Sequence, residues 1–397
     1  MADLISEAKD LFNFTQTLRR DFHMHPELGF KESRTSGIVA KELSELGLEI
    51  RTGVAETGVV AILEGGKPGP VVLLRADMDA LPIVEQTRAS YASQNPGVMH
   101  ACGHDGHIAI LLTVAKILLA HRKELSGTIK FIFQPAEEGM GGAEKMIEAG
   151  ILEGPKVDLA LGLHLWNEKP MGWFGISNGP EMAGAEIFKV HVQGKGGHAA
   201  APHLSMDPVL ASAQIITALQ SIASRNVDPL QAAVISVCTI HAGEAFNVLP
   251  PAVEFSGTIR TFEPEVRKKV LERFREVTQN VAEAMGCQAE IDLQQLTPAT
   301  INAAKIAGLV QSATRSLFPQ AVIETHTDLT MGSEDFAFIL EKVQGCFFFV
   351  GSANTEKGLN AAHHSPRFDF DESVLPNAAA VMVKTVMDLS TQASRST

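Results

Sequence analysis

The sequence has few cysteines: only Cys102, Cys238, Cys287 and Cys346 occur among its 397 residues. They are scattered along the chain, and no two of them form a C-x-x-C pair. A chain of this length can bury a sizeable core without disulfide bonds, so the spacing argues against a disulfide-rich secreted scaffold. We expect a protein of a reducing compartment.

The sequence also lacks a long basic run and a long apolar run. Its formal net charge is −13, which argues against a nucleic acid partner, because such a partner requires clustered Lys and Arg. The most apolar stretch, 108–120, contains Lys116 and is too short to span a bilayer. Residues 1–20 carry acidic side chains early and no apolar signal core. These absences predict a cytoplasmic protein with no membrane partner.

The residues that are present have ordinary globular composition, with 45% hydrophobic and 20% charged side chains. The length favours two domains. Short apolar runs typical of buried strands alternate with helical patterns. The runs are 58–65, 71–77, 128–135, 159–165 and 346–351, and the helical patterns are 33–47, 107–125 and 141–150. This alternation favours the α/β class, with a mostly parallel sheet covered on both faces.

The middle of the chain follows a different order. From residue 184 to about 294, strand-like and helical stretches alternate as β-α-β-β-α-β, which is typical of a ferredoxin-like domain. We therefore predict an inserted domain at 184–295, with 1–183 and 296–397 forming the larger domain. No internal repeat or low-complexity linker is present in the sequence.

Polar side chains gather where the predicted strands end. In an open α/β sheet, ligands bind beyond the carboxyl ends of the strands, so these side chains are expected along one edge. They are Asp77 and Asp79 after the run 71–77, Glu137 and Glu138 after 128–135, His164 at the end of 159–165, His363 and His364 after 346–351, and the cluster His100-Ala-Cys-Gly-His104-Asp-Gly-His107 before the buried helix.

Thiolate, imidazole and carboxylate groups together are the ligands that zinc-like divalent metals accept, and there are enough of them for two ions. A two-metal site can polarise a carbonyl and generate hydroxide near neutral pH. In the adjacent pair Glu137-Glu138, one carboxylate can bind metal while its neighbour acts as a general base. Each donor alone is more often an ordinary surface or hydrogen-bonded residue; their joint occurrence favours a metal site.

Other interpretations of the same residues stay open. Cys102 could be a nucleophile that forms an acyl-enzyme, and such an enzyme would survive chelation. The donors could also serve a dinuclear phosphoesterase, although the sequence shows little sign of the Lys and Arg side chains that binding a phosphate requires. A metal-binding scaffold without activity would not need Glu137 beside a complete ligand set.

The predicted inserted domain contributes His198, within the glycine-rich stretch 194–200. Glycines around a histidine are typical of a tight turn that presents the imidazole to an oxyanion, and equally of a plain hairpin. Asn247 and Arg260 lie in or beside predicted strands of the same domain. Arg is well shaped to bind a carboxylate through two hydrogen bonds, whereas an Arg in a strand is most often a surface residue.

The residues above belong to short motifs that run along the whole chain. This set resembles the metal-dependent amidohydrolases that include hippurate hydrolase, the plant auxin-conjugate hydrolases and bacterial N-acyl amino acid amidohydrolases, which are related to zinc aminoacylases and carboxypeptidases. The combination of MHACGHDGH with QPAEEG is its most specific part. The matching stretches are HMHPELGFKE (23–32), RADMDALPI (75–83), MHACGHDGH (99–107), QPAEEG (134–139), LGLHLW (161–166), GKGGHAAAPH (194–203), FNVLP (246–250), GTIRTF (257–262), MGSEDFA (331–337) and HHSPRFDFDE (363–372).

The resemblance implies a role for each matching residue. Glu137 would be the catalytic base, and Asp79 would be a carboxylate that steadies a metal ligand. His198 would contact the oxygen of the scissile carbonyl, while Asn247 and Arg260 would hold the substrate, with Arg260 on its free carboxylate. The stretch 23–32 receives no catalytic role. The implied metal ligands are Cys102, His104, Glu138, His164 and His364, with His363 the poorer choice beside His364.

The resemblance also implies an activity. The expected enzyme hydrolyses the linear amide bond of N-acyl-L-amino acids, such as hippurate-like conjugates, with two divalent metal ions: Zn, or Mn, Co or Ni. A metallo-carboxypeptidase or dipeptidase acting on short peptides is the alternative. The inserted domain would act as a lid and join two copies into a homodimer. Neither the acyl group nor the amino acid can be read from the sequence.

Overall fold

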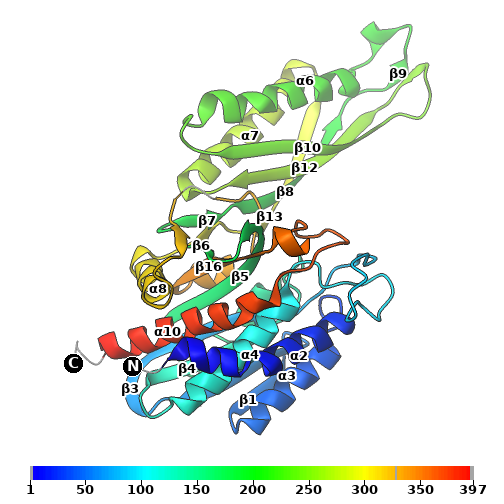
Figure 1. Ribbon diagram of the computed structural model, residues 1–397. Coiled ribbons are helices and arrows are strands. Elements are labelled where there is room, and N and C mark those ends of the chain that lie inside the picture. Colours follow the sequence, from blue (N-terminus) through cyan, green and yellow to red (C-terminus); the bar gives the residue numbers. More distant parts are fainter. Residues whose placement is uncertain (1–2, 327–328, 394–397) are drawn as a thin grey trace. The chain divides into compact units, whose positions relative to one another are not determined.

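The computed structural model describes residues 3–326 and 329–393 and divides them between two compact units (Figure 1). The large unit lies within Met1–Glu181, Ile301–Asp328 and Asp335–Thr397, and the small unit within Met182–Thr300 and Leu329–Glu334. The expected ranges 1–183, 184–295 and 296–397 differ from these bounds by a few residues and by the segment 329–334. As functional domains, those ranges stay a prediction.

One mixed sheet forms the centre of the large unit. Its strands are β1 (Glu49–Val54), β2 (Gly58–Glu64), β3 (Lys67–Asp77), β4 (Ser126–Gln134), β5 (Leu159–Pro170), β6 (Trp173–Gly175), β15 (Val322–Glu324) and β16 (Gln344–Ala353). They are arranged in the order β1-β2-β4-β3-β5-β16-β6-β15. The central strands β4, β3, β5 and β16 are parallel, so their carboxyl ends meet at one edge. The antiparallel pairs are β1 with β2, β2 with β4, and β6 with β16.

Helices cover both faces of this sheet, as the alternation predicts. On one face, Leu74 and Leu161 pack in a common core with α4 and α10 (Figure 1). On the other face, the ring of Phe347 lies 5.6 Å from that of Phe336 in α9. The expected α/β class is therefore confirmed. The helices of the large unit are α1 (Leu4–Asp10), α2 (Phe12–Met24), α3 (Ser33–Glu45), α4 (His104–Ala120), α5 (Gly142–Glu148), α8 (Ala304–Leu317), α9 (Phe336–Leu340) and α10 (Leu375–Ala393).

Helix α4 begins three residues earlier than the apolar pattern indicates. Gly103 precedes it in the left-handed conformation, with φ 96°. Glycine adopts this conformation without steric cost, so the chain turns sharply and the helix starts at His104. As a result His104 and His107 both lie on the first turn of a helix that is otherwise almost entirely buried and apolar.

The strand that carries His164 is longer than predicted. The expected strand 159–165 is too short, because β5 continues to Pro170. The pairing with β16 aligns His164 with Phe349 and Trp166 with Gly351, so the backbone of the following residues stays in the sheet. The side chain of His164 therefore leaves from within a strand, which restricts its main chain on both sides.

The small unit has the predicted β-α-β-β-α-β order. Its sheet is antiparallel, in the order β10-β12-β8-β13, and the first and last strands pair so that Ala185 lies opposite Thr297. Phe188, Phe255 and Phe274 lie in the core that the sheet forms with its two helices. The elements are β8 (Gly184–Gln193), α6 (Pro208–Ser221), β10 (Ala233–Ala242), β12 (Ala252–Thr261), α7 (Pro264–Ala284) and β13 (Gln288–Thr297). The chain crosses between the units within β7 (Pro180–Met182) and β14 (Thr300–Ile301), and again on either side of Leu329–Glu334.

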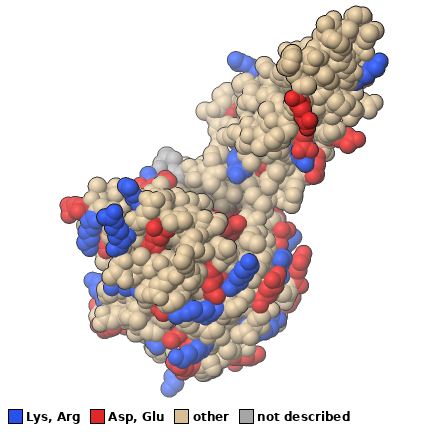
Figure 2. Space-filling view, turned by 90° about the vertical axis from the view of Figure 1, so that its right-hand side faces the viewer, with Lys and Arg blue, Asp and Glu red and all other residues tan. Residues whose placement is uncertain are grey.

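The surface carries charges of both signs. Figure 2 shows one face of the molecule, on which Lys and Arg side chains are interspersed with Asp and Glu. The described basic side chains on this face do not gather into one continuous area. Among the described helices, none combines the length and the apolar composition that crossing a membrane would need.

Candidate metal centre

Several segments of the large unit bring donors to the carboxyl edge of the parallel strands. β3 ends at Asp77, and Asp79 follows two residues later. The main-chain N–H of His364 donates to the carbonyl oxygen of Ala101 at 2.8 Å, which brings the segment after β16 beside the start of α4. Because Cys102 directly follows Ala101, this single main-chain bond sets the separation between two of the expected ligands.

The five residues expected to bind metal lie together. Cys102, His104 and His164 form one group whose ligand atoms all lie within 4.8 Å of one another. Cys102 forms a second group of this kind with Glu138 and His364. Since the thiol belongs to both groups, it could serve as a ligand in either of them. Overlapping groups of this kind offer a site for a pair of divalent ions.

Glu137 lies at the edge of the same cluster. Its carboxylate forms a third group with His104 and Glu138, again with ligand atoms within 4.8 Å. Both glutamates are half-buried and follow β4 directly. Neighbouring carboxylates on one turn can divide two tasks, so that one binds a cation while the other exchanges a proton with a reactant.

The two buried imidazoles direct their Nε2 atoms toward the donor groups. Nδ1 of His104 donates to the carbonyl oxygen of Asp79 at 2.8 Å, and Nδ1 of His164 donates to that of Leu165 at 2.7 Å. Nε2 of His164 then lies 3.4 Å from Sγ of Cys102. A histidine that binds metal almost always donates its other ring N–H in this way, which fixes the tautomer.

The protonation states also suit a cation site. Burial lowers the pKa of His164 well below its ordinary value, so this ring is neutral. Burial, with the charge of Glu138 adding to it, raises the pKa of the Cys102 thiol. Contacts with Cys102 and Glu138 raise the pKa of His364 to about 10. The thiol and this imidazolium hold protons that a divalent cation would displace on binding.

Two of the donor atoms have no hydrogen-bond partner among the described residues. They are Nε2 of His104 and Oε1 of Glu138, and both atoms are buried. Charged groups lie near both, because Oε1 of Glu138 is 3.3 Å from Nε2 of His364 and Nε2 of His104 is 3.6 Å from Oδ2 of Asp77. Divalent cations would engage both atoms, so the residues present fit the two metal ions that the resemblance implies.

Asp77 and His107 lie behind the expected ligands, and the sequence predicts no role for either of them. Nδ1 of His107 donates to Asp77 at 2.7 Å, and its Nε2 accepts the main-chain N–H of Leu165 at 3.0 Å. Asp77 also accepts from Arg75 at 2.7 Å. The pair thus connects the end of β3 to the strand that carries His164. Their positions at a strand end and on a first helical turn are the signal from which this role could be predicted.

Asp79 lies between two parts of the cluster. Its Oδ2 accepts the main-chain N–H of Glu138 at 3.0 Å, and its Oδ1 lies 3.3 Å from Nδ1 of His104. The side chain is almost fully buried. This placement suits a carboxylate that steadies ligands, which is the role implied by the resemblance and which stays a prediction.

Of the substrate-binding residues expected in the small unit, two lie together and one does not. His198 belongs to β9 (Gly197–His198), which pairs with β11 (Val248–Leu249), and the N–H of Ala199 donates to the carbonyl oxygen of Asn247 at 3.1 Å. Arg260 lies near the far end of β12, about 26 Å along the strand from Ala252, the residue beside the His198 turn. Within one chain, a small substrate can contact only one of these ends.

The comparisons with known proteins agree with this geometry. Residues 73–388 match the model of peptidase family M20/M25/M40, which covers most of the chain. The chain belongs to this family.

Similar proteins cover nearly the whole length. This M20 chain is 41% identical over 376 residues to thermostable carboxypeptidase 1 of Saccharolobus solfataricus, with 94% of each chain covered. It is 42% identical over 363 residues to N-acetylcysteine deacetylase of Bacillus subtilis, covering 91% of this chain and 93% of the relative. A Bacillus subtilis crystal structure described as a dinuclear metal binding peptidase from the M20 family is 36% identical, with a TM-score of 0.85 over 96% of this chain and 99% of that one. The resemblance is confirmed, and so is the fold with its inserted domain.

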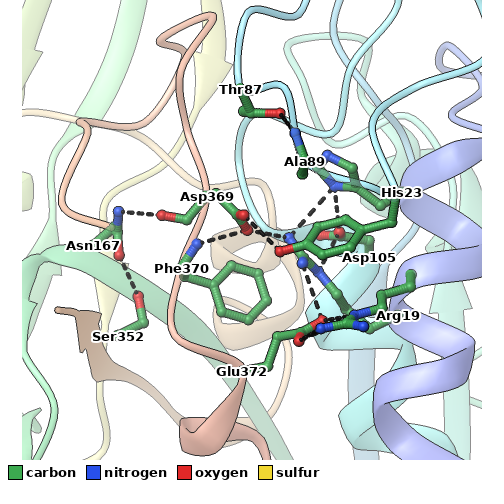
Figure 3. A network of polar contacts seen from close by, with 12 residues as sticks. Arg19, His23, Thr87, Ala89, Asp105, Asn167, Ser352, Asp369, Phe370 and Glu372 are labelled. Carbon is green, nitrogen blue, oxygen red and sulfur yellow. Dashed lines mark hydrogen bonds and ion pairs between the residues drawn. The ribbon is translucent and has the colours of Figure 1, made fainter. Parts of the chain in front are cut away.

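The buried guanidinium of Arg19 connects segments of this M20 chain that carry expected metal ligands (Figure 3). Arg19 of α2 donates to Asp105 at 2.8 Å, to Asp369 at 2.8 Å and to Glu372 at 3.2 Å, and its side chain is fully buried. Asp105 follows His104 directly, whereas the two other acids lie in the segment that carries His364. One guanidinium therefore joins the start of α4 to that segment.

The same network reaches the strand of His164. Asn167 of β5 donates to the carbonyl oxygens of Ala361 and Asp369 at 2.9 and 3.0 Å, and Ser352 donates to Asn167 at 3.1 Å (Figure 3). Burial alone would raise the pKa of Asp105, but Arg19 and a hydrogen bond from His23 hold it well below its usual range. No signal in a single sequence separates such an Arg from the exposed ones of an amphipathic helix.

We predict that Arg19→Met lowers the free energy of unfolding by about 3–5 kcal/mol at pH 7, because three buried carboxylates lose a shared guanidinium and only Glu372 keeps another, from Arg20. In the native protein the depressed pKa of Asp105 contributes stability above pH ~4, and this contribution is lost as the pH falls further. In the variant, loss of the guanidinium raises the pKa values of the buried acids Asp105 and Asp369, so its stability should rise as the pH falls from 7 to 5. Urea unfolding at the two pH values measures both effects.

The matched control is Arg20→Met. Arg20 is 38% exposed and bonds the same Glu372 at 2.6 Å. Loss of the Arg20 side chain should lower the free energy of unfolding by at most about 1 kcal/mol, as for other solvent-screened ion pairs. Equal losses of unfolding free energy in the two variants would show that the buried network stabilises the fold no more than an exposed ion pair does.

Proposed function

We propose that this protein hydrolyses the linear amide bond of N-acyl-L-amino acids and releases a carboxylic acid and a free amino acid. The observation that carries the proposal is the convergence of one thiol, three imidazoles and one carboxylate on two overlapping groups, with Glu137 beside them. The ligand assignment is Cys102, His104, Glu138, His164 and His364. The substrate is a small molecule that carries a free carboxylate.

The cations in this proposal are two divalent ions, Zn or one of Mn, Co and Ni, all of which accept thiolate, imidazole and carboxylate together. When bound, such ions polarise a carbonyl and lower the pKa of water. The identity of the native metal does not follow from the donors, because all four metals tolerate this set.

The side chains of the chain itself carry the proton transfers and the binding. Glu137 takes a proton from the attacking water and returns it to the nitrogen of the leaving amino acid. His198 donates to the oxyanion that forms at the carbonyl. Arg260 binds the free carboxylate of the substrate, for which its planar guanidinium is well suited, and Asn247 adds a further polar contact.

The rival interpretations differ in how the donors are used. The raised pKa of Cys102 disfavours a free thiolate nucleophile, because the thiolate form needs a nearby cation. A metallo-carboxypeptidase or dipeptidase would use the same donors, and the relative from Saccharolobus solfataricus carries the name carboxypeptidase. The relative from Bacillus subtilis is named for deacetylation of an N-acetylated amino acid, and we favour that chemistry.

We expect the protein reconstituted separately with each metal to cleave N-acetyl and N-benzoyl amino acids, and to cleave dipeptides and a phosphate monoester more slowly. Chelation should abolish the activity, and the divalent ion should restore it. Release of the free amino acid measures the rate. Faster cleavage of dipeptides would favour the peptidase; activity that survives chelation would favour the thiol mechanism; and metal binding without any cleavage would favour a scaffold.

Glu137→Gln should lower kcat by about 10²–10⁴-fold, because the general base is lost while the shape of the side chain remains. Cation affinity, measured by titration calorimetry, and thermal stability should stay close to those of the native protein. Glu144→Gln is the control, since Glu144 is an exposed acid in the next helix, α5. A fully active Glu137→Gln enzyme would refute the assignment of the base.

We also propose that two copies associate through the small unit. His198 and Asn247 lie at the two-stranded sheet of β9 and β11, beyond one end of β12, and Arg260 lies near the other end of β12. One substrate can therefore contact both groups only if two chains contribute. The edge strand β10 has unpaired main-chain groups and exposes Ile240, at 51% of its surface. Exposed apolar strand edges are surfaces at which chains pair. We further expect a cytoplasmic location, since all four cysteines are free.

Ile240→Asp should convert the dimer into monomers, because a charge at the pairing edge opposes association. Light scattering coupled to gel filtration measures the mass. Val322→Asp is the control: Val322 is 61% exposed on β15, an edge strand of the large sheet. A monomer from the control alone would place the interface on the large unit, and a native protein that is monomeric would refute the proposal.

A further inference from the structure

The segment 23–32, which has no part in the proposed reaction, packs against the turns that carry the donors. The main-chain N–H of Ala80 donates to the carbonyl oxygen of Glu27 at 2.8 Å, and Leu28 forms an isolated β-bridge with Ala80. Ala80 directly follows Asp79. The segment thus supports the main chain beside a carboxylate that contacts both His104 and Glu138.

The segment also approaches the turn after β4 very closely. A Cβ atom on Gly29 would lie 3.0 Å from Cβ of Ala136 and 2.7 Å from Sδ of Met140. Such contacts are shorter than van der Waals packing permits, so only glycine allows this approach. Three residues after Gly29, the side chain of Glu32 reaches the same turn.

The turn itself has an unfavourable backbone conformation. Ala136, which precedes Glu137 and Glu138, has φ 54° and is fully buried. Residues other than glycine rarely adopt this left-handed conformation, because Cβ crowds the following carbonyl oxygen. Its N–H donates to Oε1 of Glu32 at 2.9 Å, and its carbonyl oxygen accepts from Gly142 at 3.1 Å.

Two carboxylates therefore hold the turn on either side of Glu137. Glu32 accepts the N–H of Ala136, and Asp79 accepts the N–H of Glu138 at 3.0 Å. With both N–H groups engaged, the main chain of Glu137 is fixed at its two ends.

Stability alone does not account for Glu32. Its side chain is 0% exposed, its other oxygen accepts from the hydroxyl of Thr57 at 2.5 Å, and none of the ion pairs among the described residues includes it. Burial raises its pKa, and the nearby charge of Asp79 adds to this rise. Although Glu32 stands at the N-cap position of α3, its side chain makes no capping bond. A buried acid without a cation is costly, so its retention indicates a different task.

We propose that Glu32 is a positioning residue, which holds Ala136 in the left-handed conformation and thereby directs Glu137 and Glu138 toward the metal centre. It acts through the main chain and contacts neither substrate nor cation. For Glu137 this role rests on the proposed function, whereas the placement of the Glu138 carboxylate can be tested without any substrate.

The test compares Glu32→Ala with two matched variants. Glu32→Ala removes the acceptor, so the amides of 134–140 should exchange hydrogen faster in the metal-free protein. Affinity for Mn²⁺ should fall by about 10–100-fold, as for other residues that orient metal ligands. With the metal at saturation, kcat should fall by a similar factor, and KM should change little. Thr57→Val removes only the hydroxyl that donates to the other oxygen of Glu32. It should change neither the hydrogen exchange of the turn, nor the Mn²⁺ affinity, nor kcat.

Glu32→Gln keeps an acceptor for Ala136 and a donor for Thr57, so it should behave like the native protein even if Glu32→Ala fails to fold. In addition, Ala136→Gly placed in the Glu32→Ala background should restore part of the Mn²⁺ affinity, because glycine adopts positive φ without support.

The proposal is overturned if Glu32→Ala loses thermal stability but keeps native exchange in the turn and native Mn²⁺ affinity. It is also overturned if Glu32→Gln is as impaired as Glu32→Ala, since the charge and not the acceptor would then matter. Hydrogen exchange and Mn²⁺ affinity decide these points without a substrate. A failure of the amide hydrolysis proposed above would leave them unaffected.

Discussion

Buried carboxylates that accept N–H groups are the interaction on which the metal centre depends. Asp77 accepts from the ring of His107, Asp79 from the main chain of Glu138, and Glu32 from that of Ala136. In a water-poor interior such bonds are strong, and each acceptor would be costly if left alone. Several buried hydrogen bonds thus fix the main chain and the imidazole beside the expected ligands, which is the arrangement expected of a preorganised site.

The two units divide the chemistry of the proposed reaction. The large unit holds all five expected ligands and Glu137. The Arg19 network connects the segments that carry Cys102 and His104, His164, and His364 (Figure 3). The small unit offers the imidazole of His198 in its two-stranded sheet, beyond one end of β12, and the guanidinium of Arg260 near the other end of that strand. Because a sheet keeps its ends apart, the spacing between these two polar groups does not vary with small side-chain motions.

Much of the site could be predicted from the sequence because parallel strands end at a common edge. That rule predicts Asp79, Glu137 and Glu138 along one edge from apolar runs alone, and the structure brings them together there. The same rule predicts His164 near the others, but it misses that the strand continues past His164, because pairing with β16 cannot be read from one strand. The inserted β-α-β-β-α-β order was predictable from its alternating pattern.

The supporting residues were not predictable, for physical reasons. Arg19 lies on an amphipathic helix, where most Arg side chains face solvent, and only the folded chain brings three acids around it. Ala136 gives no sign of a left-handed backbone, since alanine normally avoids it. Glu32 is more than one hundred positions from the turn that it supports. Burial, backbone conformation and distant pairing all arise from tertiary structure.

The antiparallel pairing of β8 with β13 places the two ends of the inserted segment side by side. These are the first and last strands of the inserted sheet, and Ala185 lies opposite Thr297, so the chain enters and leaves that sheet on adjacent strands. All four strands of the sheet come from the inserted segment itself. A module with neighbouring ends and a complete sheet can occupy a surface loop of its host without stretching it.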